Sequence, residues 1–236
     1  MRLGLPKPLR GWRAFAGEVG IIVLGVLIAL GAQEIAEDLS DRAKAREARE
    51  LIRTELATYL GRLESRLSIN QCLTNRINEI QALVDTAARG GPIKRPTWIG
   101  RPQFWTALSV SWDAAAQSGH AALLPAAELA EYATMYDWMQ NSYDSMLIEQ
   151  ASWARIRTLE HLDYLTPETA FHINAALQDA RYRAWRIHSQ TKDLQRIAKR
   201  VGLQAKRNDI VGTRGPCYPM TTPWVQAARV NPAGEP

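Results

Sequence analysis

The stretch AFAGEVGIIVLGVLIALGAQE, residues 14–34, decides the fold of this 236-residue chain. Within it, residues 19–32 carry neither a charged nor an amide side chain. A helix that crosses a membrane needs about 20 mostly apolar residues, and residues 14–33 supply that length with Glu18 as the single charged member. We therefore predict a transmembrane anchor at 14–33, preceded by a short basic tail at 1–13.

The charges on either side of this segment indicate its direction. The bases Arg2, Lys7, Arg10 and Arg13 precede it, whereas the first charges that follow it are acidic. Further bases begin at Arg42, so the two sides of the apolar segment differ mainly in how close their bases lie to it. We expect the N-terminus inside the cytoplasm and the rest of the chain outside it.

The same segment can also be interpreted as a cleaved signal peptide, with Ala29-Leu30-Gly31 as the cleavage site. An anchor is favoured because Glu18 interrupts the apolar run and the helical pattern continues beyond Gly31. Gly25 and Ala29, four residues apart, allow another membrane helix to approach closely. Glu18 can reach the head groups or a neighbouring helix, so we predict helix packing at Glu18, Gly25 and Ala29.

The residues after the anchor have the period of amphipathic helices. Between residues 34 and about 88, apolar side chains recur at spacings of three and four, and we expect a kink at 68–70. The triplet Thr-Pro-Glu at 166–168 supplies a capping hydroxyl, a proline suited to the first helical position and an acid in the first turn. It therefore predicts the start of the last helix.

The predicted fold class is all-α. Body helices are expected at 34–88, 103–118, 125–165 and 166–201, with a Gly- and Pro-rich loop at 89–102 and glycine stops at Gly119 and Gly202. Short connections favour antiparallel neighbours, so the transmembrane helix should continue into an antiparallel bundle of about four helices within 34–203. Residues 204–236 are predicted as an irregular tail tied to the body by Cys217.

The chain has two cysteines, Cys72 and Cys217, without the close spacing of a metal or redox motif. In an oxidising compartment a disulfide between them is the simplest interpretation. The alternative is a pair of unrelated free thiols in a cytosolic protein.

The helix expected at 166–201 is basic, and the one before it is acidic. Its candidate contacts for an anionic partner or lipid head groups are Arg181, Arg183, Arg186, Arg196, Lys199 and Arg200. The alternative is that the two helices simply complement each other in charge. Nucleic acid is not an expected partner, because an exported body does not meet it.

Catalytic and metal-binding motifs do not stand out. The four histidines form no pair at ligand spacing on one helix, and there is no nucleophile elbow or phosphate loop. Asp113 and Glu160 are interpreted as ordinary surface acids. A stripe of Tyr and Met residues within 132–146 has helical spacing and indicates core packing. We expect no metal, no cofactor and no enzymatic activity.

A resemblance supports this architecture. Residues 18–30, EVGIIVLGVLIAL, followed by a charged helix that ends in RTEL at 53–56, resemble the anchor of an uncharacterised group of bacterial single-pass membrane proteins. Residues 118–125, SGHAALLP, followed by ELAEY at 128–132, are similar to a second stretch of that group. The resemblance implies a membrane helix with a helical body, and it implies no activity. With the direction indicated by the flanking charges, we expect the anchor in the bacterial inner membrane and the body in the periplasm.

These features favour a non-enzymatic scaffold or accessory subunit of a membrane complex. Its partners would be the lipid bilayer and either another membrane protein or a second copy of the chain. The alternative is a ligand-sensing bundle, which would depend on a partner to signal because no second apolar run crosses the membrane. A third hypothesis is an enzyme whose site is assembled around Trp105, His120 and Tyr136.

Overall fold

The computed structural model describes residues 11–206 and 215–222, and within these ranges it contains helices and no strand. Its α-helices are α1 (Trp12–Ser68), α2 (Asn70–Ala88), α3 (Val110–Gln117), α4 (Ala126–Ile156) and α5 (Pro167–Arg200), and its 3-10 helices are η1 (His120–Leu123), η2 (Arg157–His161) and η3 (Gly215–Cys217). The predicted all-α class is confirmed. Most of the basic tail at 1–13 and much of the tail at 204–236 lie outside the described residues.

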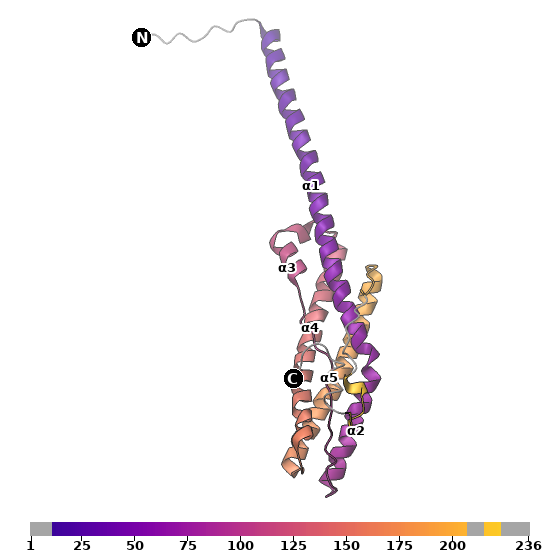
Figure 1. Cartoon of the computed structure of the whole chain (residues 1–236). Helices are drawn as coiled ribbons and strands as arrows, with labels where there is room; N and C mark the ends of the chain where they lie inside the picture. Colours follow the sequence, from indigo (N-terminus) through magenta and orange to yellow (C-terminus); the bar gives the residue numbers. More distant parts are fainter. Residues whose placement is uncertain (1–10, 207–214, 223–236) are drawn as a thin grey trace, which may run out of the picture.

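Helix α1 carries the apolar segment and continues into the body. Figure 1 shows its N-terminal half projecting away from the other helices. The helix from Phe15 onward reaches a mean hydropathy of 2.3 over 18 residues, and none of that window is buried. Among the described residues it is the one helix long and apolar enough to cross a membrane.

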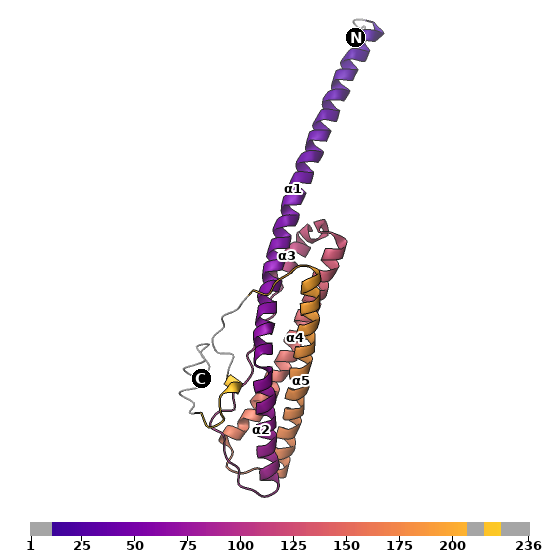
Figure 2. The same ribbon diagram turned by 90° about the vertical axis from the view of Figure 1, so that its right-hand side faces the viewer.

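The second half of α1 joins α2, α4 and α5 in an elongated bundle (Figures 1 and 2). Helices α4 and α5 form an antiparallel pair, and α2 packs on α5. The boundary between α1 and α2 falls at Ile69, which has φ −102° and ψ 7°. This break confirms the kink expected at 68–70, and the helix axis changes direction where α1 passes into α2 (Figure 1).

Both ends of α5 have the predicted signals. At the start, the Thr166 hydroxyl accepts a hydrogen bond from the Thr169 amide at 3.1 Å. At the end, Gly202 has φ +61°, a conformation that suits glycine. The guanidinium of Arg53 on α1 donates to the carbonyls of Val201 at 2.9 Å and Gly202 at 2.6 Å, so carbonyl groups at the end of α5 find a partner.

Two predicted helices have different bounds. The helix expected at 103–118 begins only at Val110, and 92–109 instead run as an extended strap from the end of α2 toward α3 (Figure 1). An extended chain advances about 3.3 Å per residue against 1.5 Å in a helix, and the strap must run back along the bundle. The helix expected to end at residue 165 gives way at Ile156 to the 3-10 helix η2, which buries Leu159.

The core consists of two hydrophobic clusters along the bundle. The cluster nearer the apolar segment joins α1, α3, α4 and the second half of α5, and includes the Tyr and Met stripe predicted as core. The cluster farther from it joins α2, the end of α4 and the first half of α5. Along their helices, Arg66 and Glu149 each fall between the two clusters, and both are buried.

Candidate functional site

The predicted packing residues of the membrane helix lie on a surface that no other described residue covers. Glu18, Gly25 and Ala29 are all exposed. Residues separated by three, four or seven positions share a helix face, so these three lie on one side of α1. A methyl group added at Gly25 would meet no atom within 4 Å. The face is therefore open, as a surface for another membrane helix must be.

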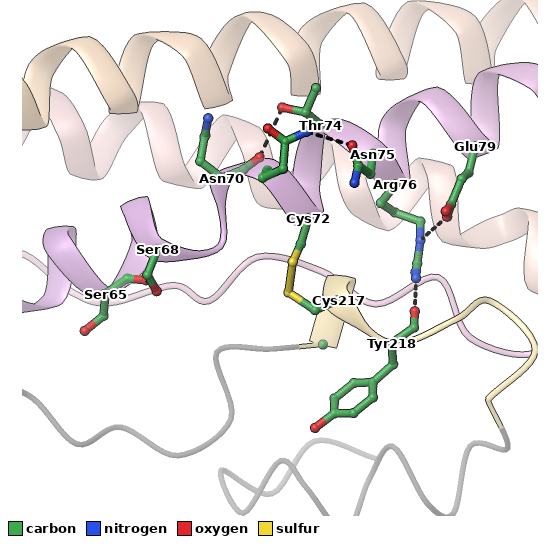
Figure 3. The surroundings of a disulfide bond; sticks show 12 residues. Ser65, Ser68, Asn70, Cys72, Thr74, Asn75, Arg76, Glu79, Cys217 and Tyr218 are labelled. Atoms are coloured by element: carbon green, nitrogen blue, oxygen red, sulfur yellow. Dashed lines mark hydrogen bonds and ion pairs between the residues drawn. A yellow bond between two sulfur atoms is a disulfide. The ribbon is translucent and has the colours of Figure 1, made fainter.

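Cys72 and Cys217 form a disulfide, as the sequence predicts (Figure 3). Their Cα atoms are 4.9 Å apart, although 145 positions separate them in the sequence. Cys72 lies in the first turn of α2, and Cys217 ends η3. The disulfide therefore ties the described part of the C-terminal segment, residues 215–222, to the bundle.

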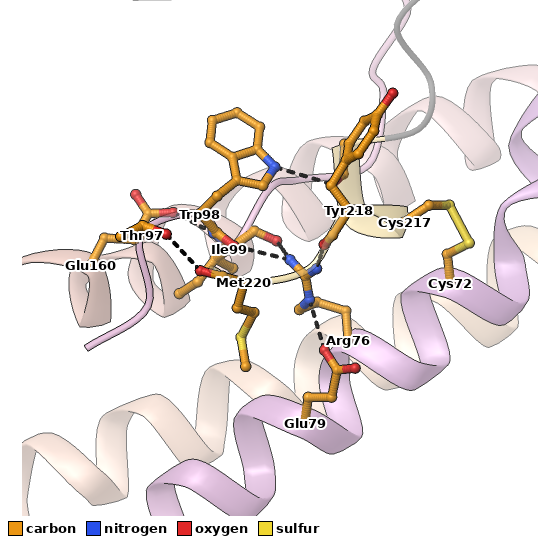
Figure 4. A network of polar contacts seen from close by, with 11 residues as sticks. Cys72, Arg76, Glu79, Thr97, Trp98, Ile99, Glu160, Cys217, Tyr218 and Met220 are labelled. Carbon is orange, nitrogen blue, oxygen red and sulfur yellow. Dashed lines mark hydrogen bonds and ion pairs between the residues drawn. A yellow bond between two sulfur atoms is a disulfide. The ribbon is translucent and has the colours of Figure 1, made fainter. Parts of the chain in front are cut away.

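Arg76, one turn after Cys72, reinforces this attachment (Figure 4). Its guanidinium donates to the backbone carbonyls of Ile99 in the strap and Tyr218 in the C-terminal segment, and its Nε lies 3.1 Å from a Glu79 carboxylate oxygen. Only 2% of the Arg76 side chain is exposed, and burial lowers its pKa despite Glu79. One buried cation thus joins α2, the strap and the C-terminal segment.

The strap and the C-terminal segment also bond to each other. The carbonyl of Met220 accepts hydrogen bonds from the amides of Thr97 at 2.8 Å and Trp98 at 3.1 Å. The indole Nε1 of Trp98 donates to the carbonyl of Gly215 at 3.1 Å. Together with the disulfide and Arg76, these bonds form a clasp between 97–99 and 215–222, which we call the C-terminal clasp.

The structure divides the six predicted anion contacts into two groups. In the first group, Arg196 pairs with Asp193 on its own helix, and Arg200 donates two hydrogen bonds to Glu131 of α4 at 2.8 and 2.7 Å. The bonds from Arg200 lower the pKa of Glu131. Lys199 is exposed beside them. At this end of α5, Arg200 alone pairs with the acidic helix α4, and Arg196 pairs within its own helix.

The second group has no such complement. Arg181, Arg183 and Arg186 form no ion pair with any carboxylate of the described chain. Between them, Tyr182 is 46% exposed and Trp185 63% exposed, with ring centroids 5.8 Å apart. The Arg183 guanidinium lies 5.3 Å from the centre of the Tyr182 ring. We call these five residues the arginine–aromatic face.

The residue types of this face are those that often carry binding free energy at protein interfaces. Trp, Tyr and Arg are the side chains most enriched where alanine substitution costs the most binding free energy. The arginines supply uncompensated positive charge, and the rings supply apolar area that is left in water. The face is therefore suited to an acidic partner that covers the two rings.

A buried ion pair lies inside the bundle, away from this surface. Arg66 donates to Glu149 at 2.7 Å, and the two side chains are 2% and 0% exposed. The second carboxylate oxygen of Glu149 has no hydrogen-bond partner in the structure. Burial raises the pKa of Glu149, although Arg66 opposes the shift. The pair is inaccessible and contributes to the packing of the bundle rather than to a binding site.

Sequence reasoning missed four buried charges, namely Arg66, Arg76, Glu149 and Glu160. Glu160, interpreted as a surface acid, has a side chain only 8% exposed, because its carboxylate accepts the Ile99 amide at 2.7 Å and faces Arg157. Arg76 and Glu149 occupy positions at which the helical period places apolar residues. In the sequence, a charged residue at a position where the helical period places an apolar one was the signal that these two side chains are buried.

Comparison with known proteins assigns no family. No protein-family model matches the chain, and neither a curated protein nor a solved structure matches it. The resemblance to a group of bacterial single-pass proteins therefore stays a prediction.

Proposed function

We propose that this protein is a non-enzymatic, single-pass membrane protein that acts by contact, as a scaffold or an accessory subunit of a membrane complex. The observation that carries the proposal is the arginine–aromatic face, where three arginines without ion pairs surround two exposed rings. Such a surface gains binding free energy when a partner covers it. Glu18, Gly25 and Ala29 offer a second contact, to a partner helix within the membrane.

The compartment belongs to the same proposal. The N-terminus lies in the cytoplasm, the helix crosses the bacterial inner membrane and the bundle lies in the periplasm. The disulfide supports this placement, because disulfides persist in oxidising compartments and are rare in the cytosol. The bases ahead of the apolar segment support it as well.

Distance along the helices favours a protein as the anionic partner over lipid head groups. Arg181 lies level with Asn78 of α2, to which it donates a hydrogen bond at 3.4 Å. At 1.5 Å per residue, this level lies roughly 65 Å along α1 and α2 from the end of the apolar segment. Electrostatic attraction between exposed charges is screened over about 8 Å at physiological salt. The partner must therefore extend well out of the membrane, with an acidic surface.

Site-specific photocrosslinking in native membranes tests the proposal. A photoreactive residue replaces Tyr182 in one variant and Ile148, an exposed residue of α4, in a control variant. We expect position 182 to capture a discrete polypeptide with an acidic extramembrane region, and position 148 not to capture it. The charge reversal R183E/R186E should abolish the crosslink. R196E, which alters an arginine that is already paired, should preserve it.

Two results would argue against the proposal. One is an identical crosslinking pattern at positions 182 and 148. The other is purification of the protein alone and monomeric from crosslinked membranes. Circular dichroism of each variant shows whether the helical content is retained, so that a lost crosslink reflects the surface rather than the fold.

A further inference from the structure

A pocket of about 300 Å³ opens between α2 and α5 and shares Arg181 and Trp185 with the arginine–aromatic face. Its lining residues are Asn70, Thr74 and Ile77 from α2 and Arg181, Ala184, Trp185 and His188 from α5. This volume is at the lower end of those found for small-molecule sites. None of the lining residues is acidic. Arg181 therefore gives the pocket a positive charge that no acidic lining residue offsets. Asn70, the first residue of α2, also lines the pocket, so the pocket lies directly beside the break between α1 and α2.

Arg181 supplies that charge. It donates to the side-chain oxygens of Gln178 at 3.0 Å and Asn78 at 3.4 Å, both of which are neutral amides. A guanidinium has five N–H donors in a planar fork, so donors remain after these two bonds. The remaining donors suit the two oxygens of a carboxylate, which arginine binds in a bidentate geometry.

Other polar groups lie beside the arginine. His188 is one of the lining residues, and its Nδ1 atom has no hydrogen-bond partner in the structure. The side chain of Asn70 lies on the opposite side of α2 from the disulfide (Figure 3), and its amide offers a further donor.

The rest of the pocket is apolar and includes one flat surface. Ile77 and Ala184 are 2% and 8% exposed and form part of the lining. The indole of Trp185 lines the same pocket while it remains 63% exposed. An indole is a large planar surface on which another ring stacks favourably.

We propose that this pocket binds a small monocarboxylate with a flat apolar body. The carboxylate bonds to the guanidinium of Arg181, and the body lies against Trp185. One guanidinium whose hydrogen-bond partners are the neutral amides of Gln178 and Asn78 matches a single negative charge, whereas a phosphate monoester carries closer to two. The ligand contacts the first turn of α2 and the middle of α5, so its binding bridges the two helices beside the break.

Titration of the full chain in detergent micelles tests the site. Benzoate is the probe, and benzyl alcohol is a neutral compound with the same ring. The indole N–H resonance of Trp185, assigned by comparison with the W185F variant, reports binding at the site. We expect saturable binding of benzoate, with benzyl alcohol and phenyl phosphate each binding at least roughly tenfold more weakly.

Two variants, R181Q and H188F, and one control variant, R196Q, identify the side chains that contribute to the binding free energy. R181Q should weaken benzoate at least roughly tenfold, because it removes the charge and the bidentate donors. R196Q changes a paired arginine on the same helix and should leave benzoate binding unchanged. H188F tests the second polar group without removing the charge, and it should weaken benzoate less than R181Q does.

Four results would overturn this inference: no saturable response to benzoate, equal binding of benzyl alcohol, tighter binding of phenyl phosphate, or unchanged binding in R181Q with retained helical content. If R181Q loses its helical content, the comparison of benzoate with benzyl alcohol on the unaltered chain decides the question. None of these results bears on the crosslink at position 182, so the pocket and the protein-binding surface are tested separately.

Discussion

At the scale of single residues, the pair of Arg66 and Glu149 has the largest energetic consequences. Each charge is almost wholly removed from water, and the attraction between them opposes a large desolvation cost. Replacing a whole buried pair with apolar side chains of similar volume is often neutral or stabilising, whereas removing one partner leaves an uncompensated charge. The single and double variants should therefore behave very differently.

We expect R66M to lose roughly 3–5 kcal/mol of unfolding free energy, and R66M/E149L to recover most of that loss. Chemical denaturation of the chain in detergent, followed by circular dichroism, measures both. S65A removes an intrahelical hydrogen bond next to Arg66 and serves as a matched control with a small effect. Equal destabilisation in R66M and in the double variant would show that the pair is not an energetic unit.

Glu149 also predicts a dependence of stability on pH. Burial raises its pKa in the folded state above the ordinary value of 4.5. Its contribution to stability is therefore complete below pH 4.5 and is lost as pH rises through the folded pKa. We expect the wild type to lose stability relative to E149Q over this range, in denaturation curves recorded at several pH values. The opposite slope would mean that Arg66 outweighs burial and holds the pKa of Glu149 below its ordinary value.

At the scale of elements, the C-terminal clasp joins a helix of the bundle, α2, to two segments without α-helix, residues 97–99 and 215–222. Cys72 and Arg76 project from one face of α2 toward residues 97–99 and 215–222 (Figures 3 and 4). In the chain-entropy model, a disulfide that closes a loop of 145 residues adds roughly 5 kcal/mol. Its loss should act first on the segments it joins.

We expect C72S/C217S to accelerate amide hydrogen exchange at Thr97 and Trp98, whose N–H groups donate to Met220. The Ile99 amide is an internal control, because it donates to Glu160 and not to the C-terminal segment. The helical content should persist, while the unfolding free energy falls by up to about 5 kcal/mol. Unchanged exchange at residues 97 and 98 would show that the other bonds of the clasp suffice without the disulfide.

The sequence predicted those helix boundaries at which a particular residue begins or ends a helix for a local physical reason. The break near Ile69, the left-handed Gly119 and the cap at Thr166 are all present. The start of α3 could not be predicted, because the path of residues 103–109 depends on the distance the strap must span. Trp105 is buried from this extended segment, and only the assembled bundle determines where its side chain packs.

At the scale of the whole molecule, α1 holds a disulfide-bonded bundle away from the apolar segment. The first buried residue of α1 is Ala48, about 22 Å along the helix beyond residue 33. The sequence predicted this arrangement but not which arginines would stay unpaired. Arg200 pairs with Glu131 because α4 and α5 run antiparallel in one particular register. That register is set by three-dimensional packing and cannot be read from the sequence of either helix.

Trapping the thiols in native membranes tests the central claim most directly. Intact cells are treated with a membrane-permeant alkylating reagent without reductant, and the membrane fraction is digested and analysed by mass spectrometry. The account predicts that the protein is in this fraction and yields a linked peptide pair containing Cys72 and Cys217. Alkylation of both cysteines in the native cell, or recovery of the intact chain in the soluble fraction, would contradict it.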